Sequence, residues 1–307
     1  MPKMINKKRK MLIIGGTGFI GYHLAKLALK KNWEVDSISR RFPQKRRKIQ
    51  KVKYFICDIT KPKDIKKKIN NNYSFVINLG GDVDHKNKIK TYKSHFLGCK
   101  NLSNFFLHKN IDTFVQIGSS AEYATAKSPQ DEDLICKPKS YYGKSKYLAT
   151  NHLLNMFKIT NFPAVILRLY QTFGPAQDTN RLIPFVINSC LKGKNFPCSN
   201  GNQFRDFLFI EDVVSSILKC YKNEKSYGQI INIGSGKPIK VKYLIEYIKD
   251  IIKNGKPNYG EIKLRKEENY KTYPKIIKAR KLLNWRPNIN FKSSLSKTIS
   301  YYKKNET

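Results

Sequence analysis

The residues Ile13-Ile14-Gly15-Gly16-Thr17-Gly18-Phe19-Ile20-Gly21 decide the fold of this chain of 307 amino acids. They follow an apolar run that begins at Met11, and they open a segment with apolar residues at helical spacing, residues 19–31. In a strand–turn–helix unit, one glycine permits the tight turn, one lets the backbone approach a pyrophosphate, and one lets helix and strand pack closely. The alternative is a tight turn without a ligand. We expect the turn to bind a dinucleotide through Gly15, Gly18, Phe19, Ile20 and Gly21.

Strands and helices alternate along the first half of the chain. Further apolar runs predict strands at residues 35–39, 52–57, 75–79, 113–117 and 164–169. Amphipathic segments predict helices at residues 61–69, 87–108 and 142–157. Repeated units of this length predict an α/β protein with a doubly wound parallel sheet, a Rossmann fold, with helices on both faces.

The regular alternation ends after Gly174-Pro175, where Pro, Gly and Asn become frequent between shorter segments. This change predicts a smaller, mixed C-terminal lobe that binds the substrate. We expect residues 1–173, with 207–234 returning, to form the cofactor-binding domain. Residues 174–206 and 235–307 are expected to form the substrate-binding lobe.

Composition and charge exclude several classes of protein. Hydrophobic residues make up 40% of the chain and aromatic residues 12%, which argues against disorder. The 60 Lys and Arg exceed the 22 Asp and Glu by 38 charges, but they run through nearly every segment instead of forming a patch. We therefore expect no nucleic-acid partner, whereas a small molecule with phosphates fits the charge.

The six cysteines form no C-x-x-C pair, and no histidine stands at metal-ligand spacing. This pattern predicts reduced thiols in a cytoplasmic protein and no metal site. The apolar run after the basic start ends at Gly15-Gly16, so it is too short for a signal peptide, and no later run reaches membrane-spanning length. We expect a soluble, cytoplasmic protein without a membrane partner.

The residues after the second predicted strand select among dinucleotides. An acid there would hold the ribose 2′-OH of NAD, but the chain has Ser39-Arg40-Arg41. A guanidinium suits a 2′-phosphate, and residues 40–53 contain no acid, so we expect these three residues to bind NADP (NADPH). Asp36 is a rival ribose ligand that falls three positions before the strand end. For residues 45–53 a solvated loop is the preferred interpretation.

The ends of the next two predicted strands complete the expected cofactor site. Asp58 is placed to meet the adenine, although it can equally cap the following helix. Ile59, Leu79 and Gly80 are also assigned to the cofactor.

Three further residues have the chemistry of a carbonyl-reducing site. Ser119 follows a strand at the carboxyl edge, and Tyr142 and Lys146 are four residues apart and therefore lie on one helix face. An ammonium beside a phenol stabilises the phenolate, and the lysine can also hold the nicotinamide ribose. Both Tyr142 and Lys146 are therefore assigned to the cofactor as well. We expect Ser119 to hydrogen-bond the substrate oxygen, Tyr142 to move its proton, and the cofactor to carry the hydride.

Together these motifs resemble the extended short-chain dehydrogenase/reductase family that modifies nucleotide sugars. The resemblance covers essentially the whole chain: residues 168–175 are similar to the family's Arg-x-x-Asn-x-Tyr-Gly-Pro stretch, and residues 201–213 to its nucleotide-sugar segment. It implies a nucleotide-diphosphate sugar as substrate, with Arg205 on the nucleotide or its diphosphate. It extends the substrate assignments to Ser120, Gln171 and Arg181. The alternative for Arg205 and Asp206 is a surface ion pair, which is not the preferred interpretation even without the resemblance.

Departures from the family narrow the expected reaction. The Asp-Glu pair of the 4,6-dehydratases is absent after Ser119, because Ser120-Ala121 stand there and Glu122 comes one position late. Ala121 also replaces the cysteine of the members that epimerise and reduce in GDP-fucose synthesis. Gln171 replaces the usual Asn. His95 stands where an Asn is frequent, and a structural histidine is the preferred interpretation over a general acid.

Two enzymatic functions remain after these departures. Arg40-Arg41 favours an NADPH-dependent reductase of a nucleotide-linked 4-keto-6-deoxy sugar, and residues 181–213 resemble the CDP-abequose synthase type of reductase. The alternative is a nucleotide-sugar 4-epimerase with a tightly bound NAD(P). A non-enzymatic NADP sensor or RNA-associated protein has no need for all three of Ser119, Tyr142 and Lys146. The resemblance also implies a homodimer through the helices expected at residues 87–108 and 142–157, whose apolar residues could instead cover the sheet.

Overall fold

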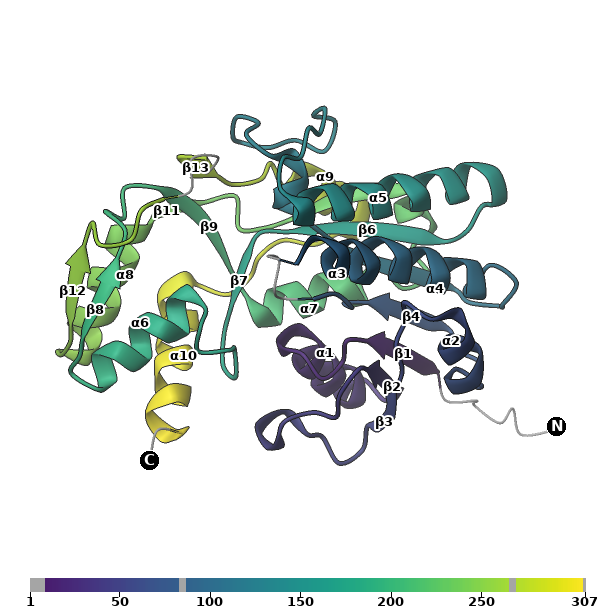
Figure 1. The fold of residues 1–307 in the computed structure, drawn as a ribbon, viewed down its shortest axis with the longest axis horizontal. Helices are drawn as coiled ribbons and strands as arrows, with labels where there is room; N and C mark the ends of the chain where they lie inside the picture. Colours follow the sequence, from purple (N-terminus) through teal and green to yellow (C-terminus); the bar gives the residue numbers. More distant parts are fainter. Residues whose placement is uncertain (1–8, 83–86, 265–268, 306–307) are drawn as a thin grey trace. The chain divides into compact units, whose positions relative to one another are not determined.

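The computed structural model describes residues 9–82, 87–264 and 269–305. The chain forms two compact units (Figure 1). Unit 1 contains the described residues up to Gly118 together with Lys144–Leu167 and Ile217–Ile230. Unit 2 contains Ser119–Gly143, Arg168–Ser216 and the described residues from Ile231 onward.

The main sheet confirms the predicted α/β fold. Its strand order is β10-β6-β5-β4-β1-β2-β3, and the pairs from β5 to β3 run parallel. In chain order these strands are β1 (Lys10–Ile14), β2 (Glu34–Ser39), β3 (Lys53–Ile56), β4 (Phe75–Asn78), β5 (Thr113–Ser119), β6 (Ala164–Leu169) and β10 (Gln229–Ile233). The order reverses at β1, between β2 and β4, which is the point where such sheets bind ligands at their carboxyl edge.

Helices cover both faces of this sheet in unit 1. They are α1 (Phe19–Lys30), α2 (Pro62–Lys68), α3 (Lys88–Tyr92), α4 (Gly98–Phe106) and α5 (Tyr141–Thr160), with short 3₁₀ turns at Lys45–Arg47 and Glu224–Ser226. Side chains of α2, α4 and α5, among them Ile65, Leu102 and Leu153, pack on the strands in one apolar core. Successive residues of β1 point to opposite faces of the sheet, and all of them from Met11 onward are buried, so both faces are covered. Helix α1 covers the face opposite to α2, α4 and α5.

The predicted helix at residues 87–108 contains an irregular turn. A π-helical turn, η2 (Lys93–Leu97), separates α3 from α4. Such turns insert an extra residue and redirect the neighbouring side chains. Here the turn buries His95, whose Nε2 lies 3.0 Å from the Asp82 carbonyl oxygen. This hydrogen bond supports the structural role that the sequence favoured for His95.

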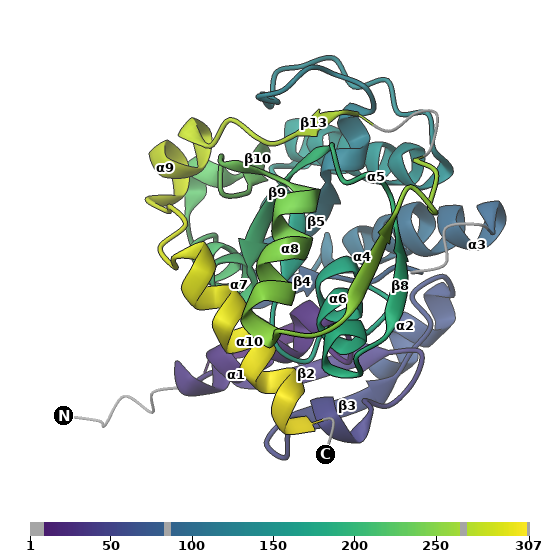
Figure 2. The same ribbon diagram turned by 90° about the vertical axis from the view of Figure 1, so that its left-hand side faces the viewer.

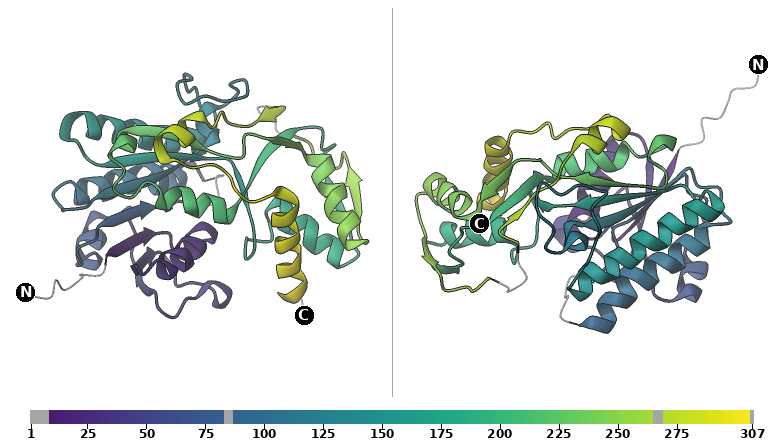
Figure 3. Two further views of the ribbon diagram at one scale, coloured as in Figure 1. Left: turned by 180° about the vertical axis from the view of Figure 1, so that it is seen from behind. Right: turned by 90° about the horizontal axis from the view of Figure 1, so that it is seen from above.

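Helices α4 and α5 lie side by side, as the blue and teal helices of Figure 3 show. The Ser103 hydroxyl lies 2.9 Å from His152 Nε2, and the His152 ring meets Phe96 edge-on. Their apolar side chains contribute to the core on the sheet. The homodimer through these helices stays a prediction.

Unit 2 is built from two small sheets and a set of helices. Strands β11 (Pro238–Lys240), β9 (Phe204–Phe209) and β13 (Lys271–Thr272) form one sheet, with β7 (Gln171–Phe173) also on β9, and β8 (Asn195–Cys198) pairs with β12 (Lys256–Tyr259). The helices are α6 (Leu182–Leu191), α7 (Ile210–Leu218), α8 (Val241–Ile252), α9 (Ile277–Leu283) and α10 (Phe291–Asn305), with a 3₁₀ turn η3 at Ser120–Tyr123. Helix α6 packs against α8 and α10 (Figure 2).

The assignment of one domain to the cofactor and the other to the substrate stays a prediction. As compact bodies, residues 119–143, 168–173, 207–216 and 231–234 belong to unit 2, although they lie inside the predicted cofactor domain. Within the described part of the chain, no helix is both long and apolar enough to span a bilayer.

Candidate functional site

Glycines shape the turn between β1 and α1. Gly15 has a φ of +77°, its N–H donates to the Ile38 carbonyl at 2.8 Å, and a Cβ there would lie 3.1 Å from the Leu79 backbone. A Cβ on Gly21 would lie 2.5 Å from the Gly16 Cα, so glycine lets α1 start against the turn. Among the described residues no side chain caps α1 and no acid occupies its first turn. Its first N–H groups are therefore available to a pyrophosphate, and the cradle fits a dinucleotide.

The end of β4 lies beside this turn. The Leu79 N–H donates to the Ile14 carbonyl at 3.0 Å, and the Gly80 N–H donates to Asn78 Oδ1 at 3.0 Å. A Cβ on Gly80 would lie 2.9 Å from Ile14 Cγ2. The structure therefore brings the predicted cofactor residues Leu79 and Gly80 together with Gly15 at the carboxyl edge of the sheet.

Asp36, the rival ribose ligand, is buried among other partners. It is 1% exposed, its carboxylate pairs with Lys10 Nζ at 2.9 Å, and it accepts a hydrogen bond from the Tyr73 hydroxyl at 2.7 Å. Burial, together with the hydrogen bond to Asp36, raises the pKa of the Tyr73 phenol. Asp36 is therefore held inside unit 1 by Lys10 and Tyr73.

Arg40 directly follows β2, where the sequence places the ribose ligand. It is half-exposed, and its NH2 group donates to Asp82 Oδ2 at 2.9 Å. Lys90 Nζ lies 3.1 Å from the same oxygen. Asp82 was not predicted as a site residue, and its one signal in the sequence is its position after Gly80-Gly81. The neighbouring Arg41 is exposed, and Ser39 is partly buried at the end of β2.

Asp58 supports the turn that leads from β3 to α2. Its Oδ1 accepts hydrogen bonds from the Thr60 N–H at 3.0 Å and the Thr60 hydroxyl at 2.8 Å. These bonds hold the turn before α2, but the N-cap of α2 is Lys61 and no side chain caps this helix among the described residues, so Asp58 is not its cap. Ile59 is buried, and a Cβ on Gly80 would lie 3.0 Å from its Cδ1. The contact of Asp58 with adenine stays a prediction.

Ser119 ends β5 and starts the 3₁₀ turn η3. Its hydroxyl oxygen accepts from the Ala121 N–H at 3.2 Å, and its own N–H donates to Glu122 Oε1 at 2.9 Å. This reciprocal capping box fixes the serine on the turn. Because the hydroxyl oxygen is the acceptor, its hydrogen can still be donated to a substrate oxygen. The predicted substrate residue Ser120 follows on the same turn.

A buried ion pair in unit 2 fixes the 3₁₀ turn η3, to which Glu122 belongs. Arg168 and Glu122 have side chains that are 1% and 0% exposed, and Arg168 NH2 lies 2.9 Å from Glu122 Oε2. The guanidinium carbon also lies 4.5 Å from the Tyr123 ring centroid. Glu122 is therefore a structural anchor for Ser119, and the absence of dehydratase chemistry stays a prediction.

The start of α5 carries Tyr142, and Lys146 follows one helical turn later. In unit 1, the buried Lys146 donates from Nζ to the Ile117 carbonyl at 2.7 Å, two residues before Ser119. In unit 2, a Cβ on Gly143 would lie 2.5 Å from the Ala121 carbonyl oxygen, so the helix start packs on the turn after Ser119. Each contact links α5 to the end of β5. The joint action of Ser119, Tyr142 and Lys146 stays a proposal.

The residues predicted to bind substrate in unit 2 differ in exposure. Gln171 is exposed at the start of β7, and Arg181 is exposed at the N-cap of α6. Arg205 is buried on β9, where its NH1 donates to the carbonyls of Phe204 at 2.8 Å and Tyr270 at 3.3 Å. Their contacts with a substrate stay predictions.

Asp206 shows that the surface ion-pair interpretation of Arg205 and Asp206 is wrong. Both residues are buried, and neighbouring residues of a strand point to opposite faces. Asp206 accepts hydrogen bonds from the N–H groups of Ser235 and Gly236, each at 2.7 Å, and from the Ser235 hydroxyl at 2.9 Å. Burial nevertheless raises the pKa of Asp206 to about 6. Its role is to hold the turn before β11.

This raised pKa predicts a pH-dependent stability. The native state binds a proton at Asp206 more readily than the unfolded state, so this group's contribution to the free energy of unfolding rises as the pH falls from 7 to 5. The gain is about 1 kcal/mol. Urea unfolding of the wild type and Asp206→Asn, which cannot titrate, checks it. The free energy of unfolding of the wild type minus that of Asp206→Asn should be larger at pH 5 than at pH 7. A difference that does not change with pH would contradict the prediction.

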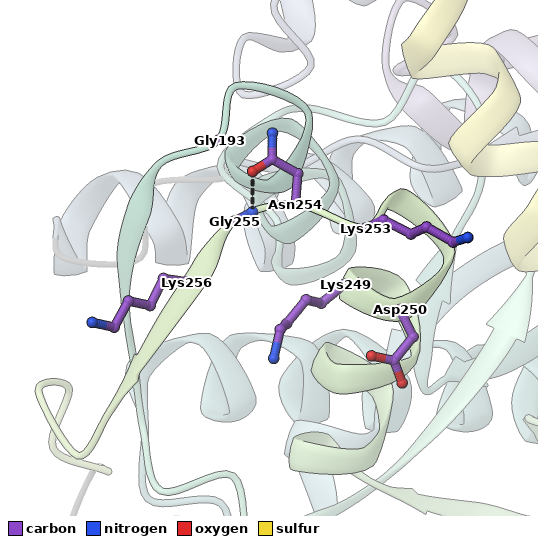
Figure 4. Close-up of a pocket in the computed structure, with 7 residues that line it drawn as sticks. All are labelled: Gly193, Lys249, Asp250, Lys253, Asn254, Gly255 and Lys256. Atoms are coloured by element: carbon purple, nitrogen blue, oxygen red, sulfur yellow. Dashed lines mark hydrogen bonds between the residues drawn. The ribbon is translucent and has the colours of Figure 1, made fainter.

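A cavity of about 490 Å³ in unit 2 lies at the end of α8 (Figure 4). None of the predicted site residues lines it. The ammonium groups of Lys249, Lys253 and Lys256 point in different directions, and Asn254 accepts a hydrogen bond from the adjacent Gly255 N–H at 2.8 Å. The lysines therefore do not converge on one anion.

Comparison with known proteins identifies the family. A model of the NAD dependent epimerase/dehydratase family matches residues 11–234. The chain therefore belongs to this family, the extended short-chain dehydrogenase/reductases, whose members are nicotinamide-dependent enzymes that act on nucleotide sugars.

Three known proteins illustrate the range of reactions in the family. A putative UDP-glucose 4-epimerase of Methanocaldococcus jannaschii is 28% identical, over 96% of this chain and 99% of that protein. The CDP-abequose synthase of Salmonella muenchen is 23% identical, over 97% of this chain and 99% of that protein. The structure of UDP-glucuronic acid 4-epimerase from Bacillus cereus, solved with UDP-glucuronic acid and NAD, is 25% identical with a TM-score of 0.85, and covers 96% of this chain and 99% of its own.

Proposed function

We propose that this chain transfers hydride between a nicotinamide cofactor and C4 of a nucleotide-linked sugar. The observation that carries the proposal is the placement of α5. Lys146 binds the Ile117 carbonyl near the end of β5, and the helix start beside Tyr142 packs on the turn that holds Ser119. These two contacts support a site in which phenol, ammonium and hydroxyl act on one substrate oxygen.

Each side chain has a defined role at that oxygen. When bound, the nicotinamide supplies or accepts the hydride. In the reducing direction Tyr142 donates its phenol proton to the C4 oxygen, and in the oxidising direction it accepts that proton. Lys146 stabilises the phenolate by its positive charge, and Ser119 donates a hydrogen bond to the same oxygen as negative charge develops. Solvent then restores the phenol proton.

We propose that the reaction is the NADPH-dependent reduction of a nucleotide-linked 4-keto-6-deoxy sugar. The residues at the end of β2 support NADPH, because Arg40 stands where an acid would bind the 2′-OH of NAD, and Asp36 is held inside the sheet. Gln171, Arg181 and Arg205 would contact the nucleotide sugar, with Ser120 near the reacting carbon.

A 4-epimerase is the second candidate function. The names of the relatives favour it, since the putative UDP-glucose 4-epimerase shares more identity with this chain than the CDP-abequose synthase does. In such a reaction Tyr142 would accept the proton of the C4 hydroxyl while the C4 hydrogen leaves as hydride to the bound nicotinamide, and the same hydride would then return to the other face of the C4 carbonyl. No net cofactor would then be consumed.

Cofactor consumption separates the two functions. Purified protein is mixed with NADPH and a panel of CDP-, GDP-, UDP- and dTDP-linked 4-keto-6-deoxy sugars, and the loss of NADPH absorbance is followed. Consumption of one equivalent per sugar reduced supports the reductase. If NADPH is not consumed, and a nucleotide-linked hydroxy sugar is instead converted to its C4 epimer, the epimerase is correct.

Arg40→Ala tests the cofactor assignment. Loss of a charge-assisted contact to the 2′-phosphate should weaken NADPH binding about tenfold or more, with a much smaller effect on NADH. Titration calorimetry with both nucleotides measures this change, and Arg286→Ala in unit 2 removes an equal charge as the control. Equal weakening of NADPH and NADH would refute the 2′-phosphate assignment.

A further inference from the structure

Arg40 is held across the carboxyl edge of the sheet by an acid. Strands β2 and β4 flank β1, Arg40 follows β2, and Asp82 lies four residues after the end of β4. The bond of 2.9 Å between Arg40 NH2 and Asp82 Oδ2 therefore spans the end of β1, where the glycine turn begins. A dinucleotide on that turn would meet this ion pair.

Asp82 itself is fixed in place by the surrounding structure. It is 4% exposed, its N–H donates to the Ser94 hydroxyl oxygen at 3.0 Å, and its carbonyl lies 3.0 Å from His95 Nε2. The His95 ring also packs so closely on Gly81 that a Cβ there would overlap it. The half-exposed Arg40, in contrast, extends from a strand end. Of the two partners, Arg40 is the one able to move.

A buried carboxylate affects two kinds of dinucleotide differently. A 2′-phosphate competes with the Asp82 carboxylate for the positive charge and the N–H donors of the Arg40 guanidinium. A ribose with a free 2′-OH has no phosphate to pair with Arg40, so it does not compete for the guanidinium. Lys90 Nζ lies 3.1 Å from the same carboxylate oxygen, so Asp82 keeps one cationic partner when Arg40 binds a phosphate.

We propose that Asp82 determines the coenzyme preference of this chain by competing with the 2′-phosphate for Arg40. Asp82 is thus a positioning residue, which acts on the cofactor through Arg40. This inference rests on the proposed dinucleotide site, and it deepens that proposal by naming what limits the affinity for NADPH.

Binding of NADPH and NADH to Asp82→Asn tests the inference, with titration calorimetry as the readout. The ratio of the NADH to the NADPH dissociation constant should rise about threefold to tenfold over the wild type. Glu34→Gln, an exposed change of equal charge at the amino end of β2, should leave the ratio unchanged. Asp82→Glu, which keeps the carboxylate, should give a ratio closer to the wild type than Asp82→Asn does.

A double variant tests whether Asp82 acts through Arg40. In an Arg40→Ala background the effect of Asp82→Asn on the ratio should largely disappear. Circular dichroism first checks that each variant is folded, and Asp82→Ser replaces Asp82→Asn if the latter does not fold. An unchanged or lower ratio in the Asp82 variant would overturn the inference, as would an equal rise in Glu34→Gln or in the Arg40→Ala background.

Failure of the proposed function and failure of the inference about Asp82 give different results in these measurements. If the wild type binds NADH more tightly than NADPH, the reductase loses its cofactor argument. The change in the ratio between wild type and Asp82→Asn still decides whether Asp82 competes for Arg40.

Discussion

Replacing Tyr142 by Phe is expected to lower turnover of the nucleotide sugar by about 10²–10⁴-fold, because the substrate oxygen loses its proton donor. The phenyl ring keeps the shape of the side chain, and the backbone contacts at the start of α5 remain. The dissociation constant of the cofactor should therefore stay close to that of the wild type. Steady-state rates and cofactor titration on the same preparation measure the two quantities.

The neighbouring Tyr141 provides a matched control. It is 46% exposed at the first position of α5, so Tyr141→Phe removes the same hydroxyl one residue away. We expect Tyr141→Phe to retain most of its turnover. Equal losses in both variants, or full activity of Tyr142→Phe, would remove Tyr142 from the proposed chemistry.

Replacing Glu122 by Ala is expected to lower the free energy of unfolding by about 3–5 kcal/mol, since it leaves Arg168 buried without its counter-charge. The Arg168 and Glu122 side chains are 1% and 0% exposed, and Nε and NH2 of Arg168 both bind Glu122 Oε2, at 3.0 and 2.9 Å. The loss also removes the acceptor of the Ser119 N–H. Urea unfolding followed by circular dichroism measures the change.

Two further variants separate the buried pair from a general charge effect. Glu211→Ala breaks an exposed pair with Lys297 at 3.8 Å and should cost about 1 kcal/mol or less. The double change Glu122→Ala with Arg168→Met removes both buried charges and should recover part of the stability. A cost for Glu122→Ala no larger than that for Glu211→Ala would contradict the anchoring role.

The parts of the fold that depend on local sequence could be predicted. The glycine turn, the strands around it and the helix at Tyr142 follow from periodicity and from residues that are close in the chain. The π-helical turn at Lys93–Leu97 could not be predicted, because it interrupts a continuous helical pattern without a Pro.

The partners of the charged residues could not be predicted either. Arg40 pairs with Asp82, 42 residues away, and Glu122 binds Arg168, 46 residues away. Such contacts depend on which strands become neighbours, and a single sequence does not state this. The residues after β2 therefore predict that Arg40 is a cation for the cofactor, but they do not indicate that Asp82 binds Arg40.

Transfer of an isotope label tests the central proposal most directly. The protein is supplied with NADPH that carries deuterium at the transferable position of the nicotinamide, together with the 4-keto sugar that it accepts, and the product is examined by nuclear magnetic resonance. We predict deuterium at C4 of the sugar with the wild type, and a strongly reduced amount with Tyr142→Phe. A reduced sugar without deuterium at C4, or equal labelling by both proteins, would contradict hydride transfer at the proposed site.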